Sequence, residues 1–529
     1  MKRQFVNYFP VLFFLPISLV MGAYLFHEYD VLSEARPVYF YYYLAIAAAP
    51  LYFFVFHPRQ DLFIETADVF EKIKTRFLKE KWIYLLIGVA FSVFYLYIAS
   101  IHISTYYERD RWILHDAIPV LPIDLVLPPR LALISSWIFP TDIAIPFVNL
   151  GFILLWYVFL VYINEGEANS WLIVFLVLII TVLSDVLFRT LYAIFEFPAA
   201  VLGFIGLYGI WRRKVNLGLY FLFVGGVFKN TGIFLVATGM FLLALILWED
   251  RSFRKFFSRF DFSLLFFLFI FFVANYLGVF YYIFVMRGGS DYIIEPGNNQ
   301  LFLISSLSAF IGILLKDYPL LFLLGLLGSI LDKRHRVVAL VLIGLLMVLR
   351  SFSRLVDSWY VMMFIPSFSF FSVLGLMHIR KISRSRWVWS VFSIFIVVFS
   401  IFKVMGLLSS FPTDTMHHKN SNFDEFIGTI AEKFPRNGRI LQREISLTPY
   451  LHELGRASES DIKFEMYPED KDVTVASLMQ PGCILIVMSK NDLGITEEEL
   501  RTLGYSDQPY SLKDESGLWA AYSKDCGDG

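Results

Sequence analysis

The chain has 529 residues, of which 57% are hydrophobic and only 17% are charged, and its net charge is −1. About a quarter of the residues in a soluble domain are charged. A mean hydropathy of +0.62 therefore excludes an ordinary water-soluble protein and indicates a chain that crosses a membrane several times. The near-zero net charge gives no sign of a nucleic-acid partner, and we expect none.

Long apolar runs recur along the first 408 residues. Because a bilayer core about 30 Å thick needs roughly 20 apolar residues in a helix, we predict about 13 transmembrane helices and an all-α, polytopic membrane domain over residues 1–408. The predicted spans are 8–27, 37–57, 82–104, 139–163, 170–186, 197–211, 216–228, 231–248, 263–286, 318–331, 337–349, 359–377 and 387–408.

Basic residues are distributed unevenly between the predicted loops. Lys2 and Arg3, the segment 58–81 and the cluster 212–214 fall on one side, together with 251–259, 333–336 and 380–386. The positive-inside rule assigns this side to the cytoplasm. The N-terminus is thus predicted to be cytoplasmic, its first apolar run a transmembrane helix, and the C-terminus extracytoplasmic, with the plasma membrane as the expected location.

The composition changes after the last predicted span. Residues 409–529 are less apolar and contain three candidate strands, at 439–445, 483–489 and 518–524, and a candidate helix at 495–502. A segment of about this length suffices for an independent core. We therefore predict a small extracytoplasmic α/β domain. The two cysteines, Cys483 and Cys526, both lie in it, and the sequence leaves open whether they pair.

An acidic loop follows the third predicted span. Residues 105–130 contain the run Glu108, Arg109, Asp110 and Arg111, then His115, before a Pro-Pro pair. Charges placed at the end of a span lie where water meets lipid, and a carboxylate at that depth can act as a general base. Loops also carry charges simply because they are wet, but the density of this cluster favours a functional site.

Further charged residues are predicted on the same extracytoplasmic side. They are Glu196, before an apolar helix; Lys229, between two spans; and Arg350 and Arg354, four residues apart and suited to an anionic headgroup. Each has a structural alternative: Lys229 can extend to the interface, and Arg354 can pair with Asp357. His417-His418 has no third ligand nearby, so no metal site is predicted.

With these residues in view, the chain resembles the GT-C superfamily of polytopic glycosyltransferases, which includes the protein O-mannosyltransferases and the lipid A aminoarabinose transferase. The resemblance spans about residues 82–408. It rests on four segments: ERDRWILHDAIP…LPP, FRTLYAIFEFPAAVLGFIGLYGIWRRK, GGVFKNTGIFL and RSFSRLVDSWYVMMFIPSFSFF. The family's Asp-Glu pair is replaced here by Glu108-Arg109-Asp110, and its Arg-Tyr dipeptide is spread over Arg354 and Tyr360.

The resemblance implies a transferase that uses a polyprenyl- or dolichyl-phosphate sugar, of the hexosyl- or mannosyltransferase kind. A glycan, lipid or protein would accept the sugar with inversion, and a divalent metal is left open. The implied catalytic residues are Asp110 as general base, Glu108 as its rival and Glu196 as a second acid. The implied phosphate ligands are Arg354, Lys229, Arg350, Arg109 and His115. A transporter or flippase of lipid-linked sugars, or an inactive scaffold subunit, remains the alternative.

Overall fold

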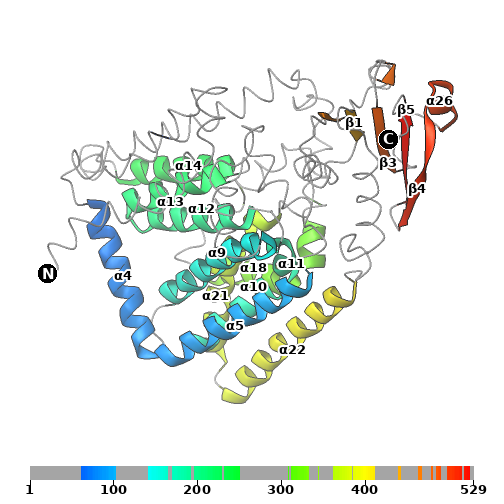
Figure 1. Cartoon of the computed structure of the whole chain (residues 1–529). Coiled ribbons are helices and arrows are strands. Elements are labelled where there is room, and N and C mark those ends of the chain that lie inside the picture. The colour runs from blue at the N-terminus through cyan, green and yellow to red at the C-terminus, as the bar shows by residue number, and fades with distance from the viewer. Residues whose placement is uncertain are drawn as a thin grey trace. The chain divides into compact units, whose positions relative to one another are not determined.

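A computed structural model gives the fold (Figure 1). It describes residues 61–102, 141–164, 170–191, 196–228, 232–250, 311–332, 361–383, 385–410, 439–442, 463–466, 484–489, 497–514 and 517–524, with a few isolated positions. These residues belong to two compact units, one of helices and one built on a β-sheet.

Four helices in the described ranges are long and apolar enough to cross a membrane. They are α5 (Lys81–His102), α9 (Thr141–Ile163), α21 (Ile365–Ile382) with the short η3 (Met362–Phe364) before it, and α22 (Arg386–Ser410). The spans predicted at 82–104, 139–163, 359–377 and 387–408 are confirmed in length and composition. The spans predicted at 8–27, 37–57, 263–286 and 337–349 lie outside the described residues.

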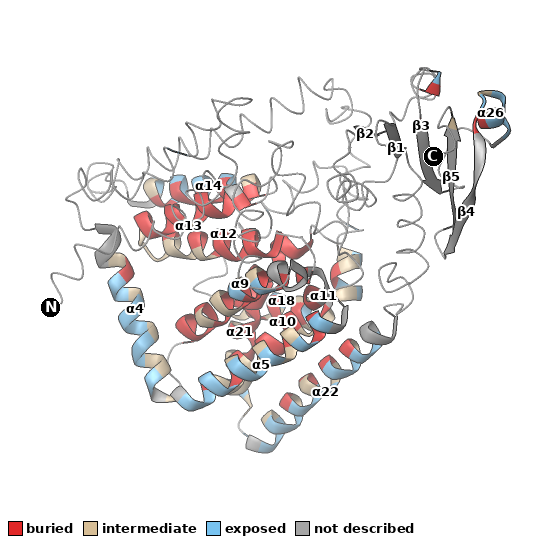
Figure 2. Ribbon diagram, in the orientation of Figure 1, coloured by how far each residue is buried: buried red, intermediate tan, exposed pale blue. Residues whose placement is uncertain are grey.

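The helices between α9 and α21 are shorter. They are α10 (Ser170–Val182), α11 (Asp185–Thr190), α12 (Glu196–Trp211), α13 (Val215–Phe228) and α14 (Gly232–Asp250). The apolar parts of α10 and α12–α14 match predicted spans. Figure 2 shows α10, α12 and α21 largely buried, while α5 and α22 expose long apolar faces. Such faces are expected to contact lipid.

The span predicted at 318–331 has a different shape from a simple crossing. A helix at Ile311–Asp317 meets α18 (Pro319–Leu331) at a 117° bend. Tyr318 separates the two, and Pro319 at the first position of α18 has no N–H to continue the earlier helix. The Lys403 ammonium, within α22, donates to the Lys316 carbonyl at 2.6 Å. This intramembrane charge thus stabilises the end of a helix.

Glycines allow the inner helices to approach closely. A Cβ on Gly206 would lie 2.6 Å from the Leu222 backbone nitrogen, so α12 and α13 meet backbone to backbone. A Cβ on Gly328 of α18 would lie 1.8 Å from the Phe371 carbonyl oxygen of α21. Small residues at helix interfaces are the usual route to tight packing in membranes. The positions of α12, α13, α18 and α21 are therefore fixed by residues without side chains.

The segment predicted as the cytoplasmic loop 58–81 forms a helix for most of its length, α4 (Asp61–Lys79). It is amphipathic and packs against α9 and α13. The Lys214 ammonium forms an ion pair with Asp68 and also donates to the Glu65 carbonyl at 3.3 Å. The connection between the two predicted spans is thus largely helical, and Lys214 holds it to the rest of the helical unit.

The sheet has the order β2-β1-β3-β5-β4. Its strands are β1 (Arg439–Gln442), β2 (Lys463–Met466), β3 (Ile484–Ser489), β4 (Ser506–Asp514) and β5 (Gly517–Lys524). β1 pairs in parallel with β2 and β3, and β5 runs antiparallel to β3 and β4. The three predicted strands are present as β1, β3 and β5, and the predicted helix as α26 (Glu497–Thr502). β2 and β4 were missed.

Candidate functional site

Glu196 is the one predicted site residue that falls within the described ranges. It begins α12, and only 3% of its surface is exposed. A carboxylate in the first turn interacts favourably with the helix dipole, and Pro198 two residues later is tolerated there because the first N–H groups of a helix have no partner within it. Phe197 and Ala199 beside it are fully buried. The sequence therefore places a buried acid at the start of an apolar helix.

The end of α11 is held by a cluster of hydrogen bonds around Thr190. The Thr190 carbonyl accepts from the Tyr95 hydroxyl at 2.8 Å and from the Asn149 amide at 2.7 Å. All three residues are buried, and they come from α11, α5 and α9. A buried carbonyl satisfied by two other helices stabilises its own position. The start of the segment that leads to Glu196 is thus fixed to α5 and α9.

The same cluster orients the end of α5 that precedes the acidic loop. Tyr95 lies seven residues before His102, where α5 ends, which is about 10 Å at 1.5 Å per residue. Because the Tyr95 hydroxyl donates to the Thr190 carbonyl, the C-terminal part of α5 lies beside the end of α11. Asp110, Glu108, Arg109 and His115 themselves lie outside the described residues.

The helices on either side of Lys229 meet near the start of α12. A Cβ on Gly225, near the end of α13, would lie 2.9 Å from the carbonyl oxygen of Ala199, in the first turn of α12. A Cβ on Gly232, where α14 begins, would lie 2.7 Å from the Gly225 carbonyl. These two glycines therefore place the α13–α14 junction beside the first turns of α12. Lys229 is itself outside the described residues.

The element that follows Arg350 and Arg354 also packs against α12. η3 contacts α12, and Val361 before it is buried. The α21 helix that continues from η3 is joined to α10 by a hydrogen bond of 2.8 Å between Thr181 and Ser369. Both arginines lie outside the described residues. The described element that follows them, η3, contacts α12, the helix that begins with Glu196.

This arrangement of helices is similar to that of a solved enzyme. The apo structure of ArnT from Cupriavidus metallidurans matches with a TM-score of 0.52 and 12% identity, over 84% of this chain and 98% of that one. ArnT from the same organism bound to undecaprenyl phosphate matches with a TM-score of 0.50 and 11% identity, over 82% and 98%. No known protein-family profile and no curated protein sequence matches.

The chain has the overall fold of ArnT. At this identity the likeness shows the fold alone. Together with the apolar helices it identifies an integral membrane protein with an ArnT-like fold, the coarse part of what the sequence predicted.

The hydrogen bonds reveal three residues that the sequence did not predict: Tyr95, Asn149 and Thr190. Asn149 could have been found, because it lies inside the apolar run of α9 and a polar group in a membrane helix needs a partner. Asp185 and Arg189, whose spacing of four residues predicts an ion pair, both belong to α11, and their side chains lie outside the described residues. The described residues contain no group of three metal-ligating side chains.

Proposed function

We propose that the protein is a membrane glycosyltransferase that moves a sugar from a polyprenyl- or dolichyl-phosphate donor to an acceptor on the extracytoplasmic side. The observation that carries this proposal is the likeness to the ArnT fold, and the packing of the end of α13, which precedes Lys229, against the first turn of α12 supports it. The sequence resemblance selects the same segments.

The proposed reaction is an inverting single displacement. An acceptor hydroxyl attacks the anomeric carbon, a carboxylate takes the hydroxyl proton, and the bond from that carbon to the phosphate oxygen breaks on the opposite face. Asp110 is the proposed base and Glu108 its rival, while Glu196 orients the acceptor or the sugar. A hexose such as mannose is the proposed sugar class.

The leaving phosphate carries negative charge that must be stabilised in a partly dry site. Arg354 and Lys229 are the proposed ligands, with Arg350, Arg109 and His115 in support. Arginine suits this role because its planar fork can bind two phosphate oxygens together. The described flank of the arginine segment, η3, packs on α12, which supports a location near Glu196.

The test is sugar transfer from a radiolabelled polyprenyl-phosphate sugar in proteoliposomes that contain the full chain. Asp110→Asn should lower turnover by about 10² to 10⁴, the usual contribution of a general base, and leave donor binding intact. Asp124→Asn, in the same loop, is the matched control and should retain wild-type turnover. Wild-type turnover in Asp110→Asn together with loss in Glu108→Gln would reassign the base to Glu108.

A transporter or flippase of lipid-linked sugars is the second candidate, favoured by one observation. The 117° bend between Ile311–Asp317 and α18 is a discontinuous helix of the kind that transporters place at their binding sites. Movement of a labelled donor across the bilayer without transfer to any acceptor would support it. An inactive scaffold would show neither transfer nor movement.

A further inference from the structure

A second feature of the helical unit lies far from Glu196. A pocket of about 700 Å³ opens between α4, α9, α12 and α13. It lies at the Arg212 end of α12, and sixteen residues of helix at 1.5 Å each put this end about 24 Å from Glu196. The uneven distribution of basic residues predicts that this end is cytoplasmic. The pocket therefore lies apart from the proposed transfer site.

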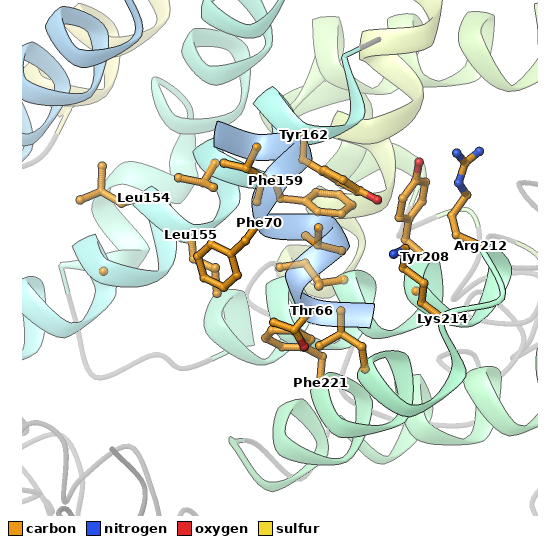
Figure 3. Close-up of a pocket in the computed structure, with 17 residues that line it drawn as sticks. Thr66, Phe70, Leu154, Leu155, Phe159, Tyr162, Tyr208, Arg212, Lys214 and Phe221 are labelled. Carbon is orange, nitrogen blue, oxygen red and sulfur yellow. The ribbon is translucent and has the colours of Figure 1, made fainter. Parts of the chain in front are cut away.

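The body of the pocket is almost entirely apolar. Phe70 of α4, Leu154 and Leu155 of α9, Ile205 of α12 and Phe221 of α13 line it (Figure 3). Gly151 lies on the same wall, and a Cβ at this position would meet no atom within 4 Å. Phe70 is 57% exposed although it lies on a helix that packs against the protein. This lining suits a hydrocarbon chain.

One side of the pocket is cationic. Figure 3 shows Arg212 and Lys214 beside Tyr208, away from Leu154 and Leu155. The Arg212 guanidinium lies 6.0 Å from the centroid of the Tyr208 ring. Arg76 lies 5.5 Å from the centroid of the Tyr162 ring, which also lines the pocket. Two arginines thus stack on two pocket tyrosines.

Arg76 lacks an anion among the described residues. Its Nη1 atom is buried and has no hydrogen-bond acceptor there. Asp68, the nearby acid with a described ion pair, is shared between Lys214 and Lys72. A buried guanidinium nitrogen without an acceptor is unfavourable, and arginine binds phosphate oxygens readily because it is planar and weakly hydrated.

We propose that this pocket binds one anionic glycerophospholipid, with an acyl chain between α4 and α9 and the phosphate at Arg76 and Arg212. The pocket volume is within the range of about 300–1,000 Å³ that holds a single small ligand. One acyl chain fits a pocket of this volume, and the rest of the lipid would lie outside it. Anionic lipids are also the lipids that basic groups select at the cytoplasmic surface.

The wall that α4 contributes is fixed to the protein. The Leu217 backbone N–H donates to the Glu65 carboxylate at 2.9 Å, and Lys214 is paired with Asp68. Both contacts join α4 to the start of α13. Arg213, between α12 and α13, has φ of 62°, and the Lys214 N–H donates to the Gly209 carbonyl at 2.9 Å, which closes a tight turn. The turn keeps Arg212 and Lys214 beside α4.

The experiment is a lipid titration of the full chain in detergent, followed by native mass spectrometry. Phosphatidylglycerol and phosphatidylcholine with the same acyl chains are compared, and undecaprenyl phosphate is the third lipid. We expect phosphatidylglycerol to bind at least about tenfold more tightly than phosphatidylcholine. Both lipids carry the phosphate, but the cationic choline group is repelled by Arg212 and Lys214, and basic groups favour lipids with a net negative charge. Equal binding of the two phospholipids, or binding of undecaprenyl phosphate alone, would overturn the proposal.

Two variants test the site itself. Arg76→Gln with Arg212→Gln should lower phosphatidylglycerol affinity about tenfold or more, because the phosphate loses both guanidinium groups. Gly151→Leu should lower binding of both phospholipids, because its side chain occupies the pocket. Lys381→Gln and Gly406→Leu are the controls: Lys381 is exposed on α21, and a Cβ on Gly406 of α22 meets nothing within 4 Å.

The outcomes separate folding from binding. Each variant is first checked for a wild-type elution volume and melting temperature. If the folded double variant Arg76→Gln, Arg212→Gln keeps wild-type affinity, the phosphate does not bind at Arg76 and Arg212, and the proposal is contradicted. Equal losses in the variants and in their controls would show nonspecific lipid binding and would also contradict the proposal.

Discussion

The Tyr95 hydroxyl of α5 donates to the Thr190 carbonyl of α11 at 2.8 Å. This single contact joins the helix that leads into the acidic loop to the chain that leads to Glu196. The Asn149 amide donates to the same carbonyl from α9, so three helices meet at one oxygen atom. The candidate site thus rests on a polar contact inside an apolar bundle.

Removal of both donors should destabilise this junction more than the sum of the single changes. Tyr95→Phe or Asn149→Leu alone leaves the Thr190 carbonyl one partner and should cost about 1 kcal/mol. The double variant leaves the buried carbonyl without either donor. Melting temperatures in detergent measure the effect, with Tyr97→Phe, exposed on the same helix, as control. Simple additivity would show that the two bonds act independently.

Glu196→Gln keeps the size of a buried side chain and removes its negative charge. If Glu196 orients the acceptor or the sugar, transfer should fall by roughly tenfold or more while the melting temperature changes little, because one charged hydrogen bond contributes about 1.5–3 kcal/mol. The transfer assay in proteoliposomes measures this. Glu80→Gln, beside the start of α5, serves as the matched control. Full activity in Glu196→Gln would restrict Glu196 to a structural role.

Gly328→Ala should destabilise the helical unit strongly. The new methyl would lie 1.8 Å from the Phe371 carbonyl oxygen, and backbone cannot yield as a flexible side chain does. Overpacking of this kind costs about 1–3 kcal/mol or more, and we expect a lower melting temperature and poorer expression. Gly312→Ala, in the helix before the bend, meets nothing within 4 Å and should be neutral or slightly stabilising. Equal behaviour of the two variants would argue against tight α18–α21 packing.

The docking of α4 should weaken at low pH. The hydrogen bond from Lys214 is the main reason why the pKa of Asp68 is lowered, with Lys72 adding to it. A carboxylate whose pKa falls on folding stabilises the protein above its unfolded pKa of about 3.9, and this contribution is lost as the pH falls through the lower folded pKa.

Asp68→Asn measures that contribution. Because the Asp68 side chain is 46% exposed, solvent screening limits the effect to less than about 1 kcal/mol. The melting temperature of the variant should lie below that of wild type at pH 7, and the difference should close toward pH 3. Glu71→Gln, an exposed pair partner of Lys74, should show almost no difference at either pH. If the melting temperatures of wild type and Asp68→Asn still differ by the same amount at pH 3, the ion-pair explanation is contradicted.

Elements of the fold were predictable where the hydropathy of a short stretch of sequence is enough to identify them. A window of about 20 predominantly apolar residues identifies α5, α9, α21 and α22 without any knowledge of their neighbours. The bend at Tyr318 was not predicted, since the apolar windows on its two sides do not reveal the angle between them. The docking of α4 was not predicted because it depends on Lys214, about 150 residues away.

The sequence by itself determined that this is a multi-span membrane protein with a cluster of acids after one span, because composition and charge order require no knowledge of contacts. It also marked Glu196 as a candidate. Only the tertiary structure decided that Tyr95, Asn149 and Thr190 meet, that Gly225 of α13 lies against the first turn of α12, and that Gly232 of α14 lies against Gly225. These contacts join residues that are far apart in the sequence. They depend on single hydrogen bonds and on glycines, neither of which produces a periodic pattern in the sequence.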